Sequence, residues 1–347
     1  MRGNNMKISI ENETKLIEDI LVAYDVKKNE ADIVASVITD GDLKGFSTHG
    51  IGRFPQYIKS IEAGTIKIEG DYEIEKETEA SAVINGNHKF GHYVTVKAMD
   101  LAVEKASKSG VGIVGIHDSN HYGIAGYYAD LASLQDMIGI VISNTEPGMA
   151  PFGGKKALLG TNPITISIPS DDIHNYICLD MATSITARGK LLEAKRKGEE
   201  IPEGLALDKE GKPTTDPEAG LEGSILPFGG FKGYGLAFMF ELLAGPLVNA
   251  ACGDKVQGTA TPDVMCTKGD LLIVIDPEHF VGAMQFKFYV DQFVKEIREE
   301  NGVIPGDREV ENIRNNHENG IEIDETLYEQ LTEIAGKKGL NIEQYFE

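Results

Sequence analysis

Apolar residues recur every three to four positions near the N-terminus, and shorter apolar runs replace this pattern further along. Two stretches with helical spacing fill residues 13–42 and are separated by a polar break at 25–29, so we expect a helical hairpin. The glycine-containing segment at residues 43–55 interrupts the spacing and is expected to form a loop or a helix start.

Strands and helices are expected to alternate between residues 81 and 275. Helical spacing recurs at residues 94–106 and 124–134, and an apolar run at 233–248 predicts a helix that is buried on nearly all sides. The strand candidates are residues 81–84, 111–116, 138–143, 164–168, 176–179 and 271–275. Such alternation favours an α/β fold in which these strands share one sheet.

Charged helical segments follow at residues 283–300 and 324–340, and we expect this tail to pack on the N-terminal hairpin. The predicted division is therefore a helical domain built from residues 1–75 and 290–347, and a sheet domain at residues 76–289.

The charge balance excludes several kinds of partner. With 33 Lys and Arg against 55 Asp and Glu, the net charge of −22 disfavours nucleic acid and anionic membrane surfaces. The three cysteines fall in no metal or redox spacing, residues 1–13 are polar, and no apolar run reaches the ~20 residues of a membrane span. We expect a cytosolic protein in which an anionic substrate requires local cations.

Two glycine-rich segments suggest phosphate binding at first sight. Gly110, Gly112 and Gly115 have the spacing of a dinucleotide fingerprint, but a helix precedes them and a strand follows, so Gly110 is expected to cap that helix. Residues 227–235 lead into the apolar helix and present Lys232, which fits either a pyrophosphate site or a tight turn.

Three histidine-containing segments carry candidate chemistry. His117 and His121 follow a predicted strand, and they suit either acid–base catalysis or a metal pair. His49 and Arg53 lie four positions apart, which suits a 2-oxo acid, although on the residues alone a solvated helix start is favoured. The segment at residues 88–92 is expected to be surface or capping structure.

Several of these motifs, in this order, resemble the malate/L-lactate dehydrogenase 2 family over nearly the whole chain, most closely its L-sulfolactate (L-2-hydroxycarboxylate) dehydrogenases of methanogenic archaea. The segments that carry the resemblance are residues 44–57, 120–128, 150–154, 159–163, 179–190 and 227–237. The resemblance implies a mixed-sheet, non-Rossmann NAD(P)-binding domain at residues 76–289, a helical domain from both chain ends, and a homodimer.

The resemblance also implies a function and its residues: reversible reduction of sulfopyruvate, oxaloacetate or 2-oxoglutarate to L-2-hydroxy acids with NADH or NADPH, in coenzyme M biosynthesis. His121 matches an acid/base residue, His49 is a second candidate for that role, and Arg53 matches a residue that binds the substrate carboxylate. The matched cofactor positions are Tyr176, Ile177, Cys178, Leu179, Asp180, Met181, Ala182, Phe231, Lys232, Pro305, Gly306 and Asp307.

Asp307 stands where glutamate is more usual, and Tyr122 where phenylalanine is common. The distal anion of such substrates needs a second cation, for which Lys155, Lys156 and Arg188 are available. The alternatives are an imine reductase or ureidoglycolate-type dehydrogenase of the same family, and a metal-dependent hydrolase or lyase that uses His117 and His121.

Overall fold

A seven-stranded mixed sheet forms the centre of the computed structural model, which describes residues 6–172 and 176–346. Its strand order is β2-β3-β4-β11-β5-β6-β7; β3 and β4 are parallel, and every other neighbouring pair is antiparallel. The strands are β2 (Glu73–Glu77), β3 (Ser81–Asn85), β4 (Val111–His117), β5 (Ile138–Ser143), β6 (Ile164–Ile168), β7 (Ile177–Met181) and β11 (Asp270–Ile275). All six predicted strands belong to this sheet, which confirms the expected fold class.

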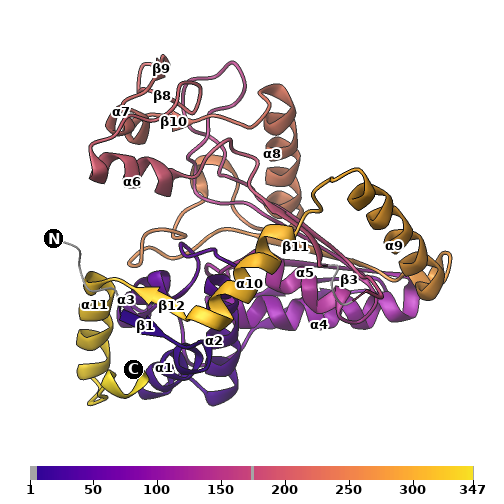
Figure 1. The fold of residues 1–347 in the computed structure, drawn as a ribbon, viewed down its shortest axis with the longest axis horizontal. Helices are drawn as coiled ribbons and strands as arrows, with labels where there is room; N and C mark the ends of the chain where they lie inside the picture. The colour runs from indigo at the N-terminus through magenta and orange to yellow at the C-terminus, as the bar shows by residue number, and fades with distance from the viewer. Residues whose placement is uncertain (1–5, 173–175, 347) are drawn as a thin grey trace.

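Helices cover both faces of the sheet (Figure 1). On one face lie α4 (Gly91–Ser109) and α5 (Ala125–Ser133), and on the other lies α8 (Phe231–Ala244). Helix α4 ends at Gly110 in the left-handed conformation, with φ of 82°, which confirms the predicted cap. A Cβ on Gly112 would come within 1.9 Å of the Ala102 carbonyl oxygen, so this glycine allows α4 to pack closely on β4.

The prediction that the apolar helix is buried on nearly all sides is wrong for the isolated chain. Ala237, Phe240 and Ala244 are buried, but Leu236, Phe238, Met239 and Leu242 are 41–56% exposed. The sheet and a smaller apolar cluster with Met149 and Leu159 pack against one side of α8, and its other side remains uncovered. By length and composition alone residues 231–248 also suit a membrane span, the one such helix in the described part of the chain.

The two chain ends form one layer beneath the sheet (Figure 1). Strand β1 pairs with β12, while α10 packs on α2 and α11 on α3. The elements of this layer are β1 (Met6–Ile8), α1 (Ile10–Ala23), α2 (Lys28–Leu43), α3 (Phe54–Glu62), α10 (Asp307–Asn319), β12 (Ile321–Ile323) and α11 (Glu325–Gly336). The predicted helical hairpin and the return of the chain after residue 324 are confirmed.

Helix α9 (Ala283–Glu299) does not join this layer, so that part of the tail prediction is wrong. It lies apart from the terminal helices in Figure 1 and buries only Val294. Met284, Phe288 and Phe293 on this helix are 80%, 54% and 63% exposed. The helical pattern was detectable in the sequence, but the pattern alone does not say which surface covers an apolar face.

A third, smaller unit contributes its own core, which includes Leu191, Ile201 and Ile225. Its elements are α6 (Arg188–Lys197), β8 (Ala206–Leu207), β9 (Pro213–Thr214), α7 (Pro217–Glu222) and β10 (Ser224–Ile225). The main apolar cluster, by contrast, runs from the terminal helices into the sheet. The predicted domain boundaries stay a prediction.

The prediction that residues 88–92 form surface or capping structure is correct in part: Phe90 is the N-cap residue of α4, but residues 89–92 are buried. Lys89, Phe90 and His92 are at most 1% exposed. Lys89 Nζ lies 2.9 Å from a Glu30 carboxylate oxygen. This buried ion pair explains how a charged residue can lie in the interior, and the sequence pattern alone does not indicate it.

We predict that Gly112→Ala lowers the free energy of unfolding by about 2 kcal/mol or more, because the new methyl group displaces α4 from β4. Gly336→Ala is the control, since a Cβ at that helical position meets no atom within 4 Å and alanine is the better helix former. Urea unfolding of both variants measures the difference. Equal stability of the two would contradict the close approach.

Candidate active site

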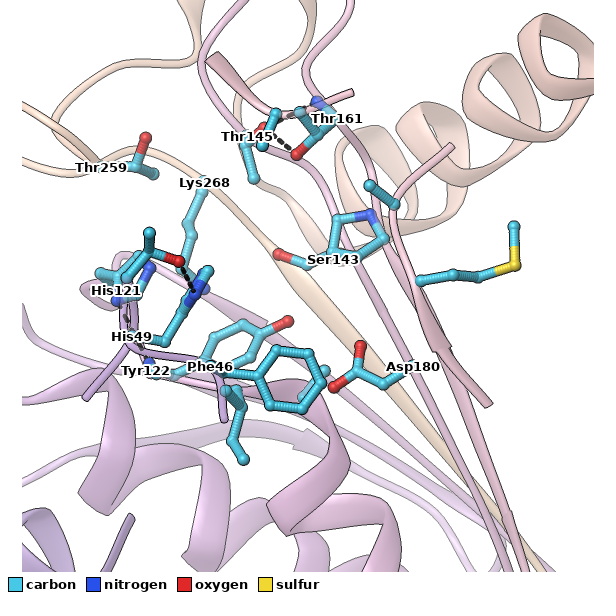
Figure 2. A pocket seen from close by; sticks show the side chains of 18 residues that line it. Phe46, His49, His121, Tyr122, Ser143, Thr145, Thr161, Asp180, Thr259 and Lys268 are labelled. Carbon is cyan, nitrogen blue, oxygen red and sulfur yellow. Dashed lines mark hydrogen bonds between the residues drawn. The ribbon is translucent and has the colours of Figure 1, made fainter. Parts of the chain in front are cut away.

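A cavity of about 310 Å³ lies where five strands of the sheet end, facing the loop before α3 (Figure 2). The carboxyl ends of β4, β5 and β7 meet there with the starts of β6 and β11, because β6 and β11 run antiparallel to their neighbours. The loop contributes Phe46, Thr48 and His49 to the wall. Segments far apart in the sequence therefore converge on one enclosed site.

His121 lines the cavity and has a defined tautomer. Its Nδ1 lies 2.7 Å from the Tyr57 hydroxyl oxygen and 3.1 Å from the Gly123 amide nitrogen. Because a backbone amide can only donate, Nδ1 accepts, and the neutral ring carries its proton on Nε2. Burial raises the pKa of Tyr57, so its hydroxyl keeps its proton and donates to Nδ1.

His49 stacks on His121, with ring centroids 5.5 Å apart, and Figure 2 shows the two side by side. Its Nδ1 lies 2.9 Å from the Thr48 hydroxyl oxygen. Burial, with a smaller contribution from the Arg53 charge, lowers the pKa of His49 to about 4 and that of His121 well below its usual value. Both rings are therefore neutral near pH 7.

Arg53 lies one turn after His49, at the start of α3. Its Nη2 donates to the carbonyl oxygen of Thr259, a residue of the cavity wall. Its Nε is buried and has no hydrogen-bond partner among the described residues. Arg53 itself does not line the cavity: its guanidinium lies behind Thr259, with Nε left without an acceptor within the described structure.

Sequence reasoning missed two residues behind the histidines. Tyr57, one turn after Arg53, is 2% exposed and donates to His121. His92 is fully buried, stands edge-on to the Tyr57 ring at 4.8 Å, and has a pKa lowered to about 3, chiefly by burial. The four-residue spacing from Arg53 to Tyr57 could have indicated that both lie on the same side of a helix. No feature of the sequence around His92 indicates that it lies behind the site.

Lys268 is a cation of the cavity wall that the sequence analysis did not name. It lines the wall, is 1% exposed, and its Nζ lies 2.7 Å from Asp270 Oδ1 and 4.3 Å from the Tyr122 ring centroid. Ser143 also donates to Asp270, at 2.7 Å. Neither Lys155, Lys156 nor Arg188 lines the cavity, and Arg188 instead donates to the Leu221 carbonyl oxygen.

His117 is separated from this site. Its Nε2 lies 3.0 Å from Glu75 and its Nδ1 3.0 Å from Asp118, whereas His121 contacts Tyr57. In residues 6–172 and 176–346 no three His, Cys, Asp or Glu side chains group as metal ligands would. The two histidines therefore do not act as one metal pair in this arrangement.

The matched cofactor stretch on β7 has one end in the cavity wall and extends away from the cavity at the other end. Asp180, Met181 and Ala182 line the wall, and Asp180 accepts a hydrogen bond of 2.8 Å from the Gly126 amide. At the other end of the strand, the Cys178 amide donates to the Pro305 carbonyl oxygen at 3.0 Å. A Cβ on Gly306 would come within 2.3 Å of the Tyr176 carbonyl oxygen, so the 305–307 turn lies directly on β7.

The other nine matched positions lie outside the cavity wall, Asp307, Phe231 and Lys232 among them. Asp307 forms a two-fold ion pair with Arg298 and accepts from the Ile304 amide at 2.8 Å, and the Arg298 guanidinium lowers its pKa. Phe231 and Lys232 are exposed at the start of α8, where the Phe231 ring packs against Phe152 at 5.9 Å.

Comparison with known proteins places this geometry in a family. Residues 8–332 match the family model described as malate/L-lactate dehydrogenase. The chain is 60% identical over 340 residues to the malate/(S)-sulfolactate dehydrogenase of Methanothermus fervidus, and 58% identical over 339 residues to the L-sulfolactate dehydrogenase of Methanothermobacter thermautotrophicus. Each alignment covers 97% of this chain and 99% of the relative.

Solved structures agree with the sequence relatives. The sulfolactate dehydrogenase of Methanocaldococcus jannaschii superposes with a TM-score of 0.93 at 52% identity, over 98% of this chain and 99% of that one. The chain therefore belongs to the malate/L-lactate dehydrogenase family of oxidoreductases.

Proposed function

We propose that the chain reversibly reduces small anionic 2-oxo acids, such as sulfopyruvate, oxaloacetate and 2-oxoglutarate, to L-2-hydroxy acids with NADH or NADPH. The observation that carries the proposal is the pair of stacked, neutral histidines in a cavity beside the Arg53 guanidinium. Similarity to L-sulfolactate dehydrogenases supports sulfopyruvate as a substrate and a role in coenzyme M biosynthesis, in the cytosol.

Arg53 is proposed to bind the carboxylate of the 2-oxo acid. A guanidinium fork matches a carboxylate in two-point geometry, and the unpartnered Nε supplies one of the donors. A buried donor without an acceptor costs about 1–3 kcal/mol, so a carboxylate at this position removes an existing penalty.

His121 is proposed to donate the proton to the former keto oxygen, with His49 kept as the second candidate. In the free protein the ring is neutral, because burial and the Arg53 charge both disfavour the cation. A substrate carboxylate on Arg53 offsets that charge and raises the pKa of His121. Proton uptake at Nδ1 then ends the hydrogen bond that Nδ1 accepts from the Gly123 amide and reverses the one with Tyr57, whose hydroxyl oxygen becomes the acceptor. Nε2–H is left as the donor to the substrate.

A bound NADH or NADPH would supply the hydride. The residues present fit such a group, because Asp180, Met181 and Ala182 form one wall of the cavity and β7 continues from there to the 305–307 turn. At about 3.3 Å per residue, the strand extends about 13 Å from Ala182 to Cys178. Tyr176, Ile177, Cys178 and Leu179, with Pro305 and Gly306, would hold its far end.

Lys268 is proposed to serve the second anion of a sulfonate- or carboxylate-bearing substrate. It is the one cationic side chain of the described cavity wall, and the Asp270 carboxylate holds it in place. A dianionic substrate needs a second cation in addition to Arg53, since an unpaired buried anion is strongly unfavourable.

Self-association is proposed through the uncovered apolar faces of α8 and α9. Their exposed side chains include Leu236, Met239, Met284, Phe288 and Phe293, and large exposed apolar patches mark interaction surfaces. The expected state is a homodimer. A monomeric mass by light scattering would contradict it.

The alternatives within the family, an imine reductase or a ureidoglycolate-type dehydrogenase, retain the histidines and Arg53 but require a different distal pocket. Lys268 favours an anionic distal group over either alternative.

We predict that His121→Ala lowers kcat for 2-oxo acid reduction by roughly 10²- to 10⁴-fold, because the positioned proton donor is lost. The cofactor Kd is expected to change little. His49→Ala is the matched comparison and is expected to lower kcat less. Stopped-flow and steady-state kinetics decide between the two residues, and a larger loss in His49→Ala would move the donor role to His49.

We predict that removing the Lys268 charge abolishes the preference for dianionic substrates. Lys268→Met alone would leave Asp270 as an unpaired buried carboxylate, so it is combined with Asp270→Asn. The double variant should lose about 10- to 100-fold in kcat/KM for oxaloacetate and little for pyruvate, as expected for a lost charge-assisted hydrogen bond.

Asp270→Asn alone is the control for this prediction, since it keeps the ammonium group. It should retain the preference for oxaloacetate over pyruvate. An unchanged preference in the double variant would remove Lys268 from substrate recognition.

A further inference from the structure

The turn that carries His49 and Arg53 is fixed at its centre by one side chain from α2. The Asp42 carboxylate accepts a hydrogen bond from the Ile51 amide. A Cβ on Gly50 would lie only 2.0–2.2 Å from the Asp42 carboxyl atoms. Gly50 has φ of −88°, which any residue can adopt, so the close approach of Asp42 is what requires glycine there.

A second acid stands behind Asp42. Glu13, from α1, is fully buried, and Asp42 is 6% exposed. Both Glu13 carboxyl oxygens lack a hydrogen-bond partner in the described part of the chain, and Asp42 is close enough for its charge to raise the pKa of Glu13. No described lysine, arginine or histidine forms an ion pair with either acid.

The other groups around the pair do not neutralise it. Asn316, from α10, donates to the Asp42 backbone carbonyl oxygen. The hollow beside Asp42 is lined by Lys7 from β1 and Glu322 from β12, and Lys7 forms no ion pair with Asp42 or Glu13 in residues 6–172 and 176–346.

Two adjacent buried carboxyl groups cannot both be ionised without a large penalty, so the pair retains one proton near neutral pH. Burial raises the pKa of Asp42 to about 6, and burial together with the Asp42 charge raises that of Glu13 well above its usual value. The contacts have the same sense: Asp42 accepts from the Ile51 amide, whereas Glu13 is buried without a hydrogen-bond partner among the described residues, which favours its neutral, protonated form.

We infer that Asp42 and Glu13 are positioning residues for His49 and Arg53, and that they hold the turn in place only while they share a proton. Loss of that proton sets two buried carboxylates against each other behind Gly50 and displaces the turn. The substrate-binding part of this inference rests on the proposed function; the shared proton does not.

Kinetics against pH test the role in the reaction. In the wild type, the KM for the 2-oxo acid should rise about tenfold or more as the pair loses its proton at alkaline pH, with a smaller change in kcat. Glu13→Gln keeps the size of the side chain but has no proton to lose, so its KM should stay flat over the same range. Glu11→Gln, at an exposed position of the same helix, is the matched control and should behave like the wild type.

A second readout does not depend on activity. When folding raises the pKa of a carboxyl group, the free energy of unfolding falls as the pH rises from the pKa in the unfolded chain to the pKa in the folded protein. The melting temperature of Glu13→Gln should therefore exceed that of the wild type by a margin that grows from pH 5 to pH 9. For Glu11→Gln the margin should stay constant.

The outcomes separate the two ideas. An alkaline rise in KM that persists in Glu13→Gln, or that is missing from the wild type, overturns the positioning role. A margin in melting temperature that does not change with pH overturns the shared proton. A wild type that reduces no 2-oxo acid but shows the growing margin contradicts the proposed function and leaves the shared proton established.

Discussion

Desolvation of two stacked imidazole rings beside a guanidinium group is the constraint on which the site depends. Burial keeps His49 and His121 neutral, and the Arg53 charge acts in the same direction. In the proposed mechanism an anion bound to Arg53 raises the pKa of the ring, so that one electrostatic interaction would couple substrate binding to proton uptake. The contacts from Tyr57 and Gly123 to Nδ1 fix which nitrogen faces the chemistry.

Both chain ends are needed to hold this arrangement. The loop with His49 and Arg53 follows α2, Asn312 and Asn316 of α10 donate to carbonyl oxygens at the end of α2, and β1 pairs with β12. The sheet supplies His121 and Lys268 from the ends of β4 and β11. The site therefore lies where the terminal layer meets the sheet, and Lys44 joins the two through its ion pair with Asp130 at 2.8 Å.

Local sequence was sufficient for the elements and for part of the site. Helical spacing predicted α1 and α2, short apolar runs predicted six strands, and the reversed order around Gly110 excluded a Rossmann arrangement. His49 and His121 were identified from their motifs and line the same cavity. Lys268, His92 and Glu13 were not identified, because only the fold brings them next to Tyr122, Tyr57 and Asp42, which are distant from them in the sequence. The exposed faces of α8 and α9 escaped prediction for a related reason, since an apolar pattern does not specify what covers it.

The most direct test of the central claim is the fall in absorbance at 340 nm with NADH or NADPH, for sulfopyruvate, oxaloacetate, 2-oxoglutarate and pyruvate, with and without a chelator. The account predicts oxidation of the reduced cofactor that a chelator does not affect, faster with dianionic acids than with pyruvate. No oxidation with any of these acids, or activity that a chelator abolishes, would contradict it.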